Sequence, residues 1–182
     1  MSPAPRPPGP ASVEVYHGTS AKIGSQSLES GSFKKADDSG SWLGTGVYFW
    51  EGDRDRAVLF AHNRHGKQYM VLKTQLSLGS CLDLTQSRFA PLVRSAYRQL
   101  KQRSATKGDR LARNVGRRHF LDCQVINHLC ETMCHFDTVR CAFRDGDRIY
   151  AGAELFGLSQ VMIAVRNTDM ILGPTEFVAQ GV

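Results

Sequence analysis

Residues 15–19, with the sequence VYHGT, combine residue types that could hold a polar ligand. His17 and Thr19 offer directional hydrogen bonds to hydroxyl groups, and Gly18 lets a ligand approach the backbone closely. The N–H and C=O of such a glycine are then available to bind an amide group. The segment predicts a polar binding site at the end of a strand. The alternative is a histidine whose hydrogen bonds are satisfied within a turn.

A second segment, residues 44–50 with the sequence GTGVYFW, suits a flat ring. Gly44 and Gly46 give the backbone room to bend, and the Tyr48 that follows presents an aromatic face for stacking. The alternative is a strand whose aromatic side chains fill the core, which is the expectation for Phe49 and the tryptophan after it. The glycines precede a strand and lack the third glycine of the Rossmann fingerprint, so they do not predict that dinucleotide-binding fold.

The order and spacing of these segments resemble the ADP-ribosyltransferase superfamily, in the branch that includes diphtheria-toxin-like and poly(ADP-ribose) polymerase-like enzymes. The shared pattern is a strand ending in His-Gly-Thr, then G-x-G-V-Y-F, then a helix with A-x-x-F-A. The resemblance implies that NAD is the co-substrate, that His17 holds a ribose hydroxyl, that the Gly18 backbone holds the nicotinamide carboxamide, and that Tyr48 stacks on nicotinamide. It also implies that Phe60 covers the other face of the ring. Further residues assigned to NAD binding are Thr19, Gly46 and Phe49.

The family also places a glutamate at the start of a late strand, where its charge stabilises the oxocarbenium-like centre that forms as nicotinamide leaves. In this chain the strand predicted over 161–166 is preceded by Gln160, and the nearest glutamate is Glu154. Either Gln160 orients the ribose through neutral hydrogen bonds, which argues against polymer elongation, or the preceding loop folds back over NAD and Glu154 supplies the anion. Both residues are therefore catalytic candidates beside His17 and Tyr48.

The positive charge of the chain is concentrated in one segment. The formal net charge is +6, yet residues 88–118 alone hold ten Lys or Arg and one acid, a local balance of +9 that leaves −3 for the rest. Arg94, Arg98 and Lys101 share one face of a helix predicted there, with apolar residues available to pack behind them. Such a face is commonly a solvated one, but a balance this positive also favours a polyanion, such as RNA, DNA or a nucleotide. The apolar residues are Phe89, Leu92, Val93, Ala96 and Leu100.

Apolar periodicity and turn residues predict the elements that position these segments. Asp53 is placed to cap a helix that contains Ala57, Phe60 and Ala61. Strands at both ends of the chain with helices between them favour an α+β fold, and the resemblance implies a split, twisted sheet with a helical insertion. The predicted strands cover 13–16, 46–50, 69–76, 81–84, 138–143, 161–166 and 170–172. The predicted helices cover 87–105 and 117–134, with a short helix and a loop in 19–41.

A length of 182 residues suits one domain, expected over 13–182, with a basic helical segment at about 86–135. Residues 1–12 hold five of the seven prolines and are expected to be a disordered tail. No apolar run approaches the length of a membrane span and no secretory signal is recognisable, so the expectation is a soluble protein without a membrane partner. The odd number of cysteines favours reduced thiols and a cytoplasmic location. No metal site is expected, because the sequence has no C-x-x-C pair and two of its cysteines share one helix face with apolar residues, as small core residues do: Cys123, Ile126, Cys130 and Met133.

The combined expectation is an NAD-dependent mono-ADP-ribosyltransferase that modifies a macromolecular or nucleotide acceptor, such as nucleic acid or protein. A toxin or a defence effector would fit this activity. One alternative is an NAD glycohydrolase, which uses water as the acceptor and predicts nicotinamide release without a labelled macromolecule. The other is a nucleic-acid-binding module whose NAD-binding cleft has decayed, which predicts salt-sensitive binding and no NAD turnover.

Overall fold

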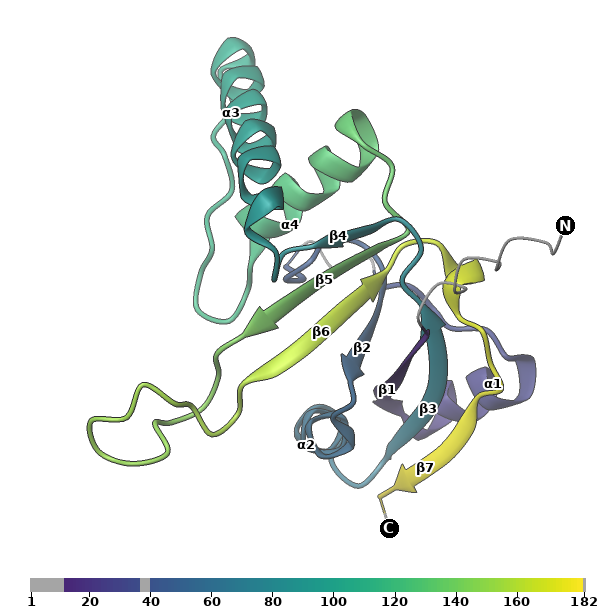
Figure 1. Ribbon diagram of the computed structural model, residues 1–182. Helices are drawn as coiled ribbons and strands as arrows, with labels where there is room; N and C mark the ends of the chain where they lie inside the picture. Colours follow the sequence, from purple (N-terminus) through teal and green to yellow (C-terminus); the bar gives the residue numbers. More distant parts are fainter. Residues whose placement is uncertain (1–11, 37–39, 182) are drawn as a thin grey trace, which may run out of the picture.

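The protein has a mixed α+β fold built on one seven-stranded sheet (Figure 1). The computed structural model describes residues 12–36 and 40–181. In this part of the chain the strand order is β4-β5-β6-β2-β1-β3-β7, in which β4 and β5 are parallel and all other neighbours are antiparallel. The α+β class predicted from the sequence is confirmed. The strands are β1 (Ser12–Ser20), β2 (Val47–Glu51), β3 (Tyr69–Ser77), β4 (Cys81–Asp83), β5 (Thr138–Phe143), β6 (Gln160–Val165) and β7 (Glu176–Gln180).

Four helices pack against this sheet within the described ranges. They are α1 (Ala21–Ser30), α2 (Arg54–His65), α3 (Ala90–Lys107) and α4 (Phe120–His128); shorter helical segments cover Ser87–Phe89, Leu129–Met133 and Thr168–Met170. Asp53 accepts a hydrogen bond from the Arg56 N–H at 3.0 Å, which confirms the predicted cap of α2. Gly108 ends α3 with a φ of 72°, in the left-handed region that glycine tolerates. None of these helices combines the length and the apolar character that a membrane span requires.

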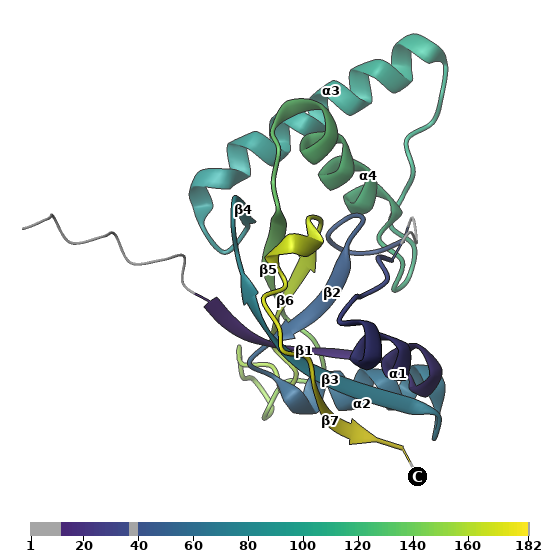
Figure 2. The ribbon, with the colours of Figure 1, turned by 90° about the vertical axis from the view of Figure 1, so that its right-hand side faces the viewer.

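The two faces of the sheet carry separate cores, because successive strand residues point to opposite faces. On one face α2, α3 and α4 bury Ala57, Ala96 and Ile126 against the strands. On the other face α1 lies against β3, where Gly24 contacts Met70. Figure 2 shows α3 and α4 together at one end of the molecule, and α1 and α2 at the other.

The contact between β1 and β2 is the shortest antiparallel pairing in the sheet. Within the described ranges, β1 and β2 pair only as Val15 with Glu51 and Tyr16 with Trp50. In contrast, β1 pairs with β3 along its whole length, and β2 pairs with β6 from Val47 onward. The sheet is therefore divided into β1-β3-β7 and β2-β6-β5-β4, joined at a narrow junction.

Several boundaries differ from the sequence-based expectations. The strand predicted at 170–172 is reduced to a single β-bridge between Ile171 and Leu76, because Thr168–Met170 forms a 3₁₀ turn. The last strand is β7, an exposed edge strand without clear apolar alternation. The helix predicted at 117–134 begins only at Phe120, after a β-bridge between Val115 and Arg118. Of the expected tail, 1–11 lie outside the described residues, and its last residue already belongs to β1.

Candidate active site

His17 lies on β1 where β1 and β2 separate. Its Nδ1 atom is 2.8 Å from the backbone carbonyl oxygen of Tyr48. Because a carbonyl oxygen only accepts hydrogen bonds, this contact assigns the ring proton to Nδ1 and leaves Nε2 of the neutral ring as an acceptor. Burial lowers the pKa of His17 below its ordinary value of 6.5, although the bond to Tyr48 opposes this shift, so the neutral ring prevails at neutral pH. His17 therefore presents an acceptor suited to a hydroxyl group.

Two aromatic rings hold this imidazole in place. The ring of Phe33 meets it edge-on at 5.3 Å between centroids, and the ring of Phe49 lies 5.4 Å away. Phe49 is fully buried, so it can affect a ligand only indirectly, by packing against the His17 ring. Thr19, the next residue of β1 on the same face, is also buried. The core under His17 thus fixes the direction of Nε2.

The backbone of Gly18 faces the gap in pairing between β1 and β2. The Gly52 N–H donates to the Glu14 carbonyl at 3.0 Å, so the polar backbone groups of Glu14 face β2. Alternate residues of an antiparallel strand face the same side, and those of Gly18 therefore also face β2. If the register that pairs Tyr16 with Trp50 continued, Gly18 would lie opposite Tyr48. Instead, the Tyr48 carbonyl accepts a hydrogen bond from the His17 ring. Within the described ranges the β1–β2 ladder does not reach Gly18, so its N–H and C=O lie side by side as a donor and an acceptor on the β2 side.

Helix α2 makes glycine necessary at this position. A Cβ atom on Gly18 would lie 2.5 Å from the carbonyl oxygen of Ala57 and 3.0 Å from the Cβ of Ala61. Both alanines are fully buried. The helix therefore packs directly on the backbone of β1 beside the pairing gap.

Tyr48 is half-buried, and its hydroxyl is fixed by the loop that precedes its own strand. The hydroxyl donates to the Gly44 carbonyl at 2.6 Å and accepts from the Leu43 N–H at 2.8 Å. Burial raises the pKa of Tyr48, so the phenol stays protonated and keeps both bonds. Gly46 pairs its own backbone with Ala36, which donates to the Gly46 carbonyl at 2.8 Å. Gly46 thus helps to place the loop.

Two residues far along the chain anchor this glycine-rich loop. The Asn127 side chain accepts from the Thr45 N–H at 2.9 Å and donates to the Thr45 hydroxyl at 3.1 Å. Arg166 donates to the Asn127 side-chain oxygen at 2.8 Å and to the Thr45 carbonyl at 3.1 Å. Gly44 has a φ of 78°, and a Cβ there would lie 2.5 Å from the same Asn127 oxygen. The loop that positions Tyr48 is therefore built against α4 and the end of β6.

Gln160 is the first residue of β6 and is buried. Its side-chain oxygen accepts from the Trp50 indole N–H at 2.6 Å and from the Arg56 Nε–H at 3.1 Å. Arg56 also pairs with Asp145 at 2.7 Å. Although burial raises the pKa of Asp145, hydrogen bonds from the Gly146 N–H and Arg56 hold it below its usual range. Two donors fix the Gln160 amide, and its NH₂ group has no acceptor among the described residues.

Glu154 lies in a different environment from Gln160. It belongs to the loop between β5 and β6, which extends away from the rest of the sheet (Figure 1). Its side chain is 78% exposed and pairs with Arg148 at 2.7 Å. Arg148 also donates to the Ala153 carbonyl. Gln160 and Glu154 are the two candidates for the late position, which is the position that the family fills with a glutamate at the start of the late strand. The structure separates them, with Gln160 inside the fold and Glu154 on a solvent-exposed loop.

Phe60, the residue expected to cover a second ring face, packs on Trp50. The two ring centroids are 4.8 Å apart at an angle of 48°, and Arg64 lies over the outer side of the Phe60 ring. Phe60 is 38% exposed, so part of its ring remains open to solvent. It stands on the same side as Gln160, which is bound to the same indole.

Sequence reasoning missed three residues that position this site: Arg56, Asn127 and Arg166. The last two are separated from Thr45 by 82 and 121 residues. Short motifs cannot reveal such long-range contacts. Arg56 lies in the first turn of α2, where an arginine is unremarkable until the fold places Gln160 beside it.

Comparisons with protein-family models, with curated proteins and with solved structures find no match. The arrangement of the groups around His17, Gly18 and Tyr48, and the motifs that contain them, are therefore what bears on the function of the protein.

Proposed function

We propose that the protein transfers a single ADP-ribose unit from NAD to a macromolecular or nucleotide acceptor. The main support for this proposal is the contact between the His17 ring and the Tyr48 carbonyl. This contact leaves the Gly18 backbone and His17 Nε2 available to bind a ligand at the junction of β1 and β2. Such an arrangement combines a donor and acceptor for an amide with an acceptor for a hydroxyl group. NAD carries a carboxamide on a flat ring, with a ribose next to it.

The nicotinamide end of NAD fits the groups around Gly18. The glycine N–H and C=O complement the C=O and NH₂ of a carboxamide, which is a pairing of two neutral hydrogen bonds. The half-buried Tyr48 ring offers a stacking face whose direction is fixed by its hydroxyl contacts. Phe60, which is partly exposed on α2, would bound the space for the nicotinamide ring on the side of that helix.

We assign the ribose end of NAD to His17 and Gln160. A neutral His17 accepts from a ribose hydroxyl through Nε2, and the Gln160 NH₂ group donates to a ribose oxygen. In the transfer, the bond between the ribose C1′ and the nicotinamide nitrogen breaks, nicotinamide leaves with the bonding electrons, and an acceptor oxygen or nitrogen bonds to C1′ as its proton passes to solvent. A preorganised site contributes to the rate of this step by positioning.

The neutral amide of Gln160 supports transfer of one unit instead of polymer growth. A carboxylate would stabilise the positive charge that develops at C1′ more strongly than an amide does. We assign the late position to Gln160, because it is held beside Trp50 and Arg56. Glu154 is assigned to the acceptor side, because its loop is exposed and lies outside the sheet.

The test is incubation with NAD labelled on the adenylate, in separate reactions with protein, RNA, DNA and free nucleotides, while nicotinamide release is measured. The expected result is nicotinamide release together with label on one pool, both abolished in Tyr48→Ala. Release without label would identify a glycohydrolase, in which water replaces the acceptor, and would overturn transfer. Intact NAD in all reactions would overturn the proposed chemistry altogether.

A further inference from the structure

The basic segment 88–118 presents its charge to solvent. All ten of its Lys and Arg residues are exposed. Apart from Arg118, none forms an ion pair with a residue in the described ranges. Ala96 is fully buried, and the apolar residues expected behind the charges pack on the core, which confirms the predicted division of α3 into two sides. The ten are Arg88, Arg94, Arg98, Lys101, Arg103, Lys107, Arg110, Arg113, Arg117 and Arg118.

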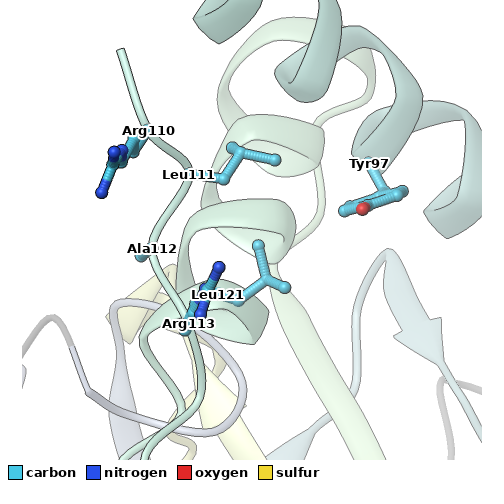
Figure 3. Close-up of a pocket in the computed structure, with 6 residues that line it drawn as sticks. All are labelled: Tyr97, Arg110, Leu111, Ala112, Arg113 and Leu121. Carbon is cyan, nitrogen blue, oxygen red and sulfur yellow. The ribbon is translucent and has the colours of Figure 1, made fainter.

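A groove runs between α3, the start of α4 and the connector that joins them (Figure 3). Its volume is about 740 Å³, and it is open to solvent. The residues that line it are Tyr97, Arg110, Leu111, Ala112, Arg113 and Leu121. In the close-up, Leu111 and Leu121 lie between the connector and the Tyr97 ring, while Arg110 and Arg113 belong to the connector. The groove thus combines an apolar floor, an aromatic ring and two cations.

Tyr97 continues a line of cations along α3. Arg94 precedes it by three residues and Lys101 follows it by four, and residues at these spacings are neighbours on a helix surface. The Tyr97 ring is 37% exposed. A strand of phosphates that follows these cations would therefore pass directly beside an accessible aromatic ring and the groove behind it.

We infer that this groove binds single-stranded nucleic acid, with phosphates on the cations and a base stacked on Tyr97. Charge complementarity selects a polyanion, because ten exposed cations face a single acid in the segment. The aromatic ring and the leucine floor select a single strand, since only unpaired bases can insert a flat apolar face between charged contacts. A duplex offers phosphates without free base faces. The inference does not depend on the proposed NAD chemistry.

The test is fluorescence anisotropy of the full chain, without NAD, on a labelled oligothymidylate of about 12 nucleotides, within the site sizes of known single-strand binders. Binding is expected to weaken as salt increases, with a slope of log K against log salt of about −2 to −4. Arg110→Ala with Arg113→Ala should weaken binding about tenfold or more, and Tyr97→Ala about fivefold or more, while Tyr97→Phe retains the affinity.

A matched control separates the groove from overall charge. Lys22→Ala with Lys67→Ala removes the same two positive charges from exposed positions on α1 and after α2. This double variant should leave the affinity for the oligothymidylate unchanged within twofold. Equal losses in both double variants, equal competition by duplex DNA or by an acidic polypeptide, or an unchanged affinity in Tyr97→Ala would each overturn the inference. Because NAD is absent, these outcomes are independent of NAD turnover.

Discussion

The Nδ1 atom of His17 donates to the backbone carbonyl of Tyr48 at 2.8 Å, at the position where the next pair of the β1–β2 ladder would form. A side chain thereby replaces the backbone of Gly18 as the donor to that carbonyl. The same contact fixes the histidine tautomer and leaves the glycine N–H available. One hydrogen bond thus prepares two groups for a ligand.

Replacement of His17 by alanine should weaken NAD binding about 10- to 100-fold, because one hydrogen bond is lost and the pairing gap loses the side chain that holds it open. Isothermal titration calorimetry would give the dissociation constant. His62→Ala, which removes an exposed histidine from α2, should leave it unchanged. Equal affinity in His17→Ala would contradict the role of Nε2.

The affinity for NAD should depend on pH through His17. Burial lowers the pKa of this ring below 6.5, so the affinity should stay constant as pH falls toward 6.5 and decrease only below it. The decrease follows because a proton on Nε2 removes the acceptor. The folding stability should change in the same direction, since the unfolded chain binds the proton more readily than the folded one. His17→Asn should abolish this pH dependence of binding; tighter binding in acid would be inconsistent with it.

Replacement of Gly18 by alanine should lower the free energy of unfolding by about 1 to 3 kcal/mol, because the new Cβ would overlap the backbone of α2. Urea denaturation followed by far-ultraviolet circular dichroism would measure it. Gly157→Ala is the matched control, since the nearest atom to its Cβ lies 3.7 Å away. Similar losses in both variants would show that α2 does not pack on β1 in this way.

Exchange of Gln160 for glutamate should increase the rate of nicotinamide release about tenfold or more, because a carboxylate can accept from the same Trp50 and Arg56 donors and adds a negative charge near C1′. Steady-state release of nicotinamide measures this rate. Glu154→Gln should leave the rate of release unchanged and alter only the labelling of the acceptor. The reverse pattern, with loss of release in Glu154→Gln and none in Gln160→Ala, would move the late position to Glu154.

Replacement of Arg140 by leucine should destabilise the fold by about 3 to 5 kcal/mol, since it leaves two largely buried carboxylates unpaired. Arg140 binds Glu51 at 2.6 Å and Asp83 at 3.3 Å, and all three side chains are less than one quarter exposed. Urea denaturation at neutral pH measures the loss. Arg54→Leu, which removes an exposed pair with Asp55, should have no measurable effect.

The same ion pairs predict a dependence of stability on acid. Burial raises the pKa of Asp83, but hydrogen bonds from Thr85 and Gln86, with the charge of Arg140, hold it below its ordinary value of 3.8. The contribution of Asp83 is therefore present above that value and is lost as pH falls through the lower, folded-state pKa. The wild-type chain should lose more stability than Asp83→Asn between about pH 4 and pH 2. Parallel losses in the two proteins would contradict the shift.

The sequence predicted the parts of the fold that follow from local patterns. The strand with Tyr48, the cap at Asp53 and the buried side of α3 are all determined by short-range spacing, and the structure confirms them. The assignment of His17 and Tyr48 to one NAD site stays a prediction; the structure shows that the His17 ring contacts the Tyr48 backbone carbonyl. β7 was missed because its exposed edge position imposes no apolar alternation. The supports of the site, Asn127 and Arg166, act across long separations that only tertiary structure brings together.

The narrow junction between β1 and β2 also has a mechanical consequence. Because few residue pairs join β1 to β2 in the described ranges, we expect the angle between β1-β3-β7 and β2-β6-β5-β4 to change more easily than any other angle of the sheet. A ligand that contacts both β1 and β2 would add hydrogen bonds across this junction. Because such a ligand binds only the folded chain, it would raise the thermal stability by mass action. Affinity for the ligand and resistance of the chain to unfolding are then linked quantities.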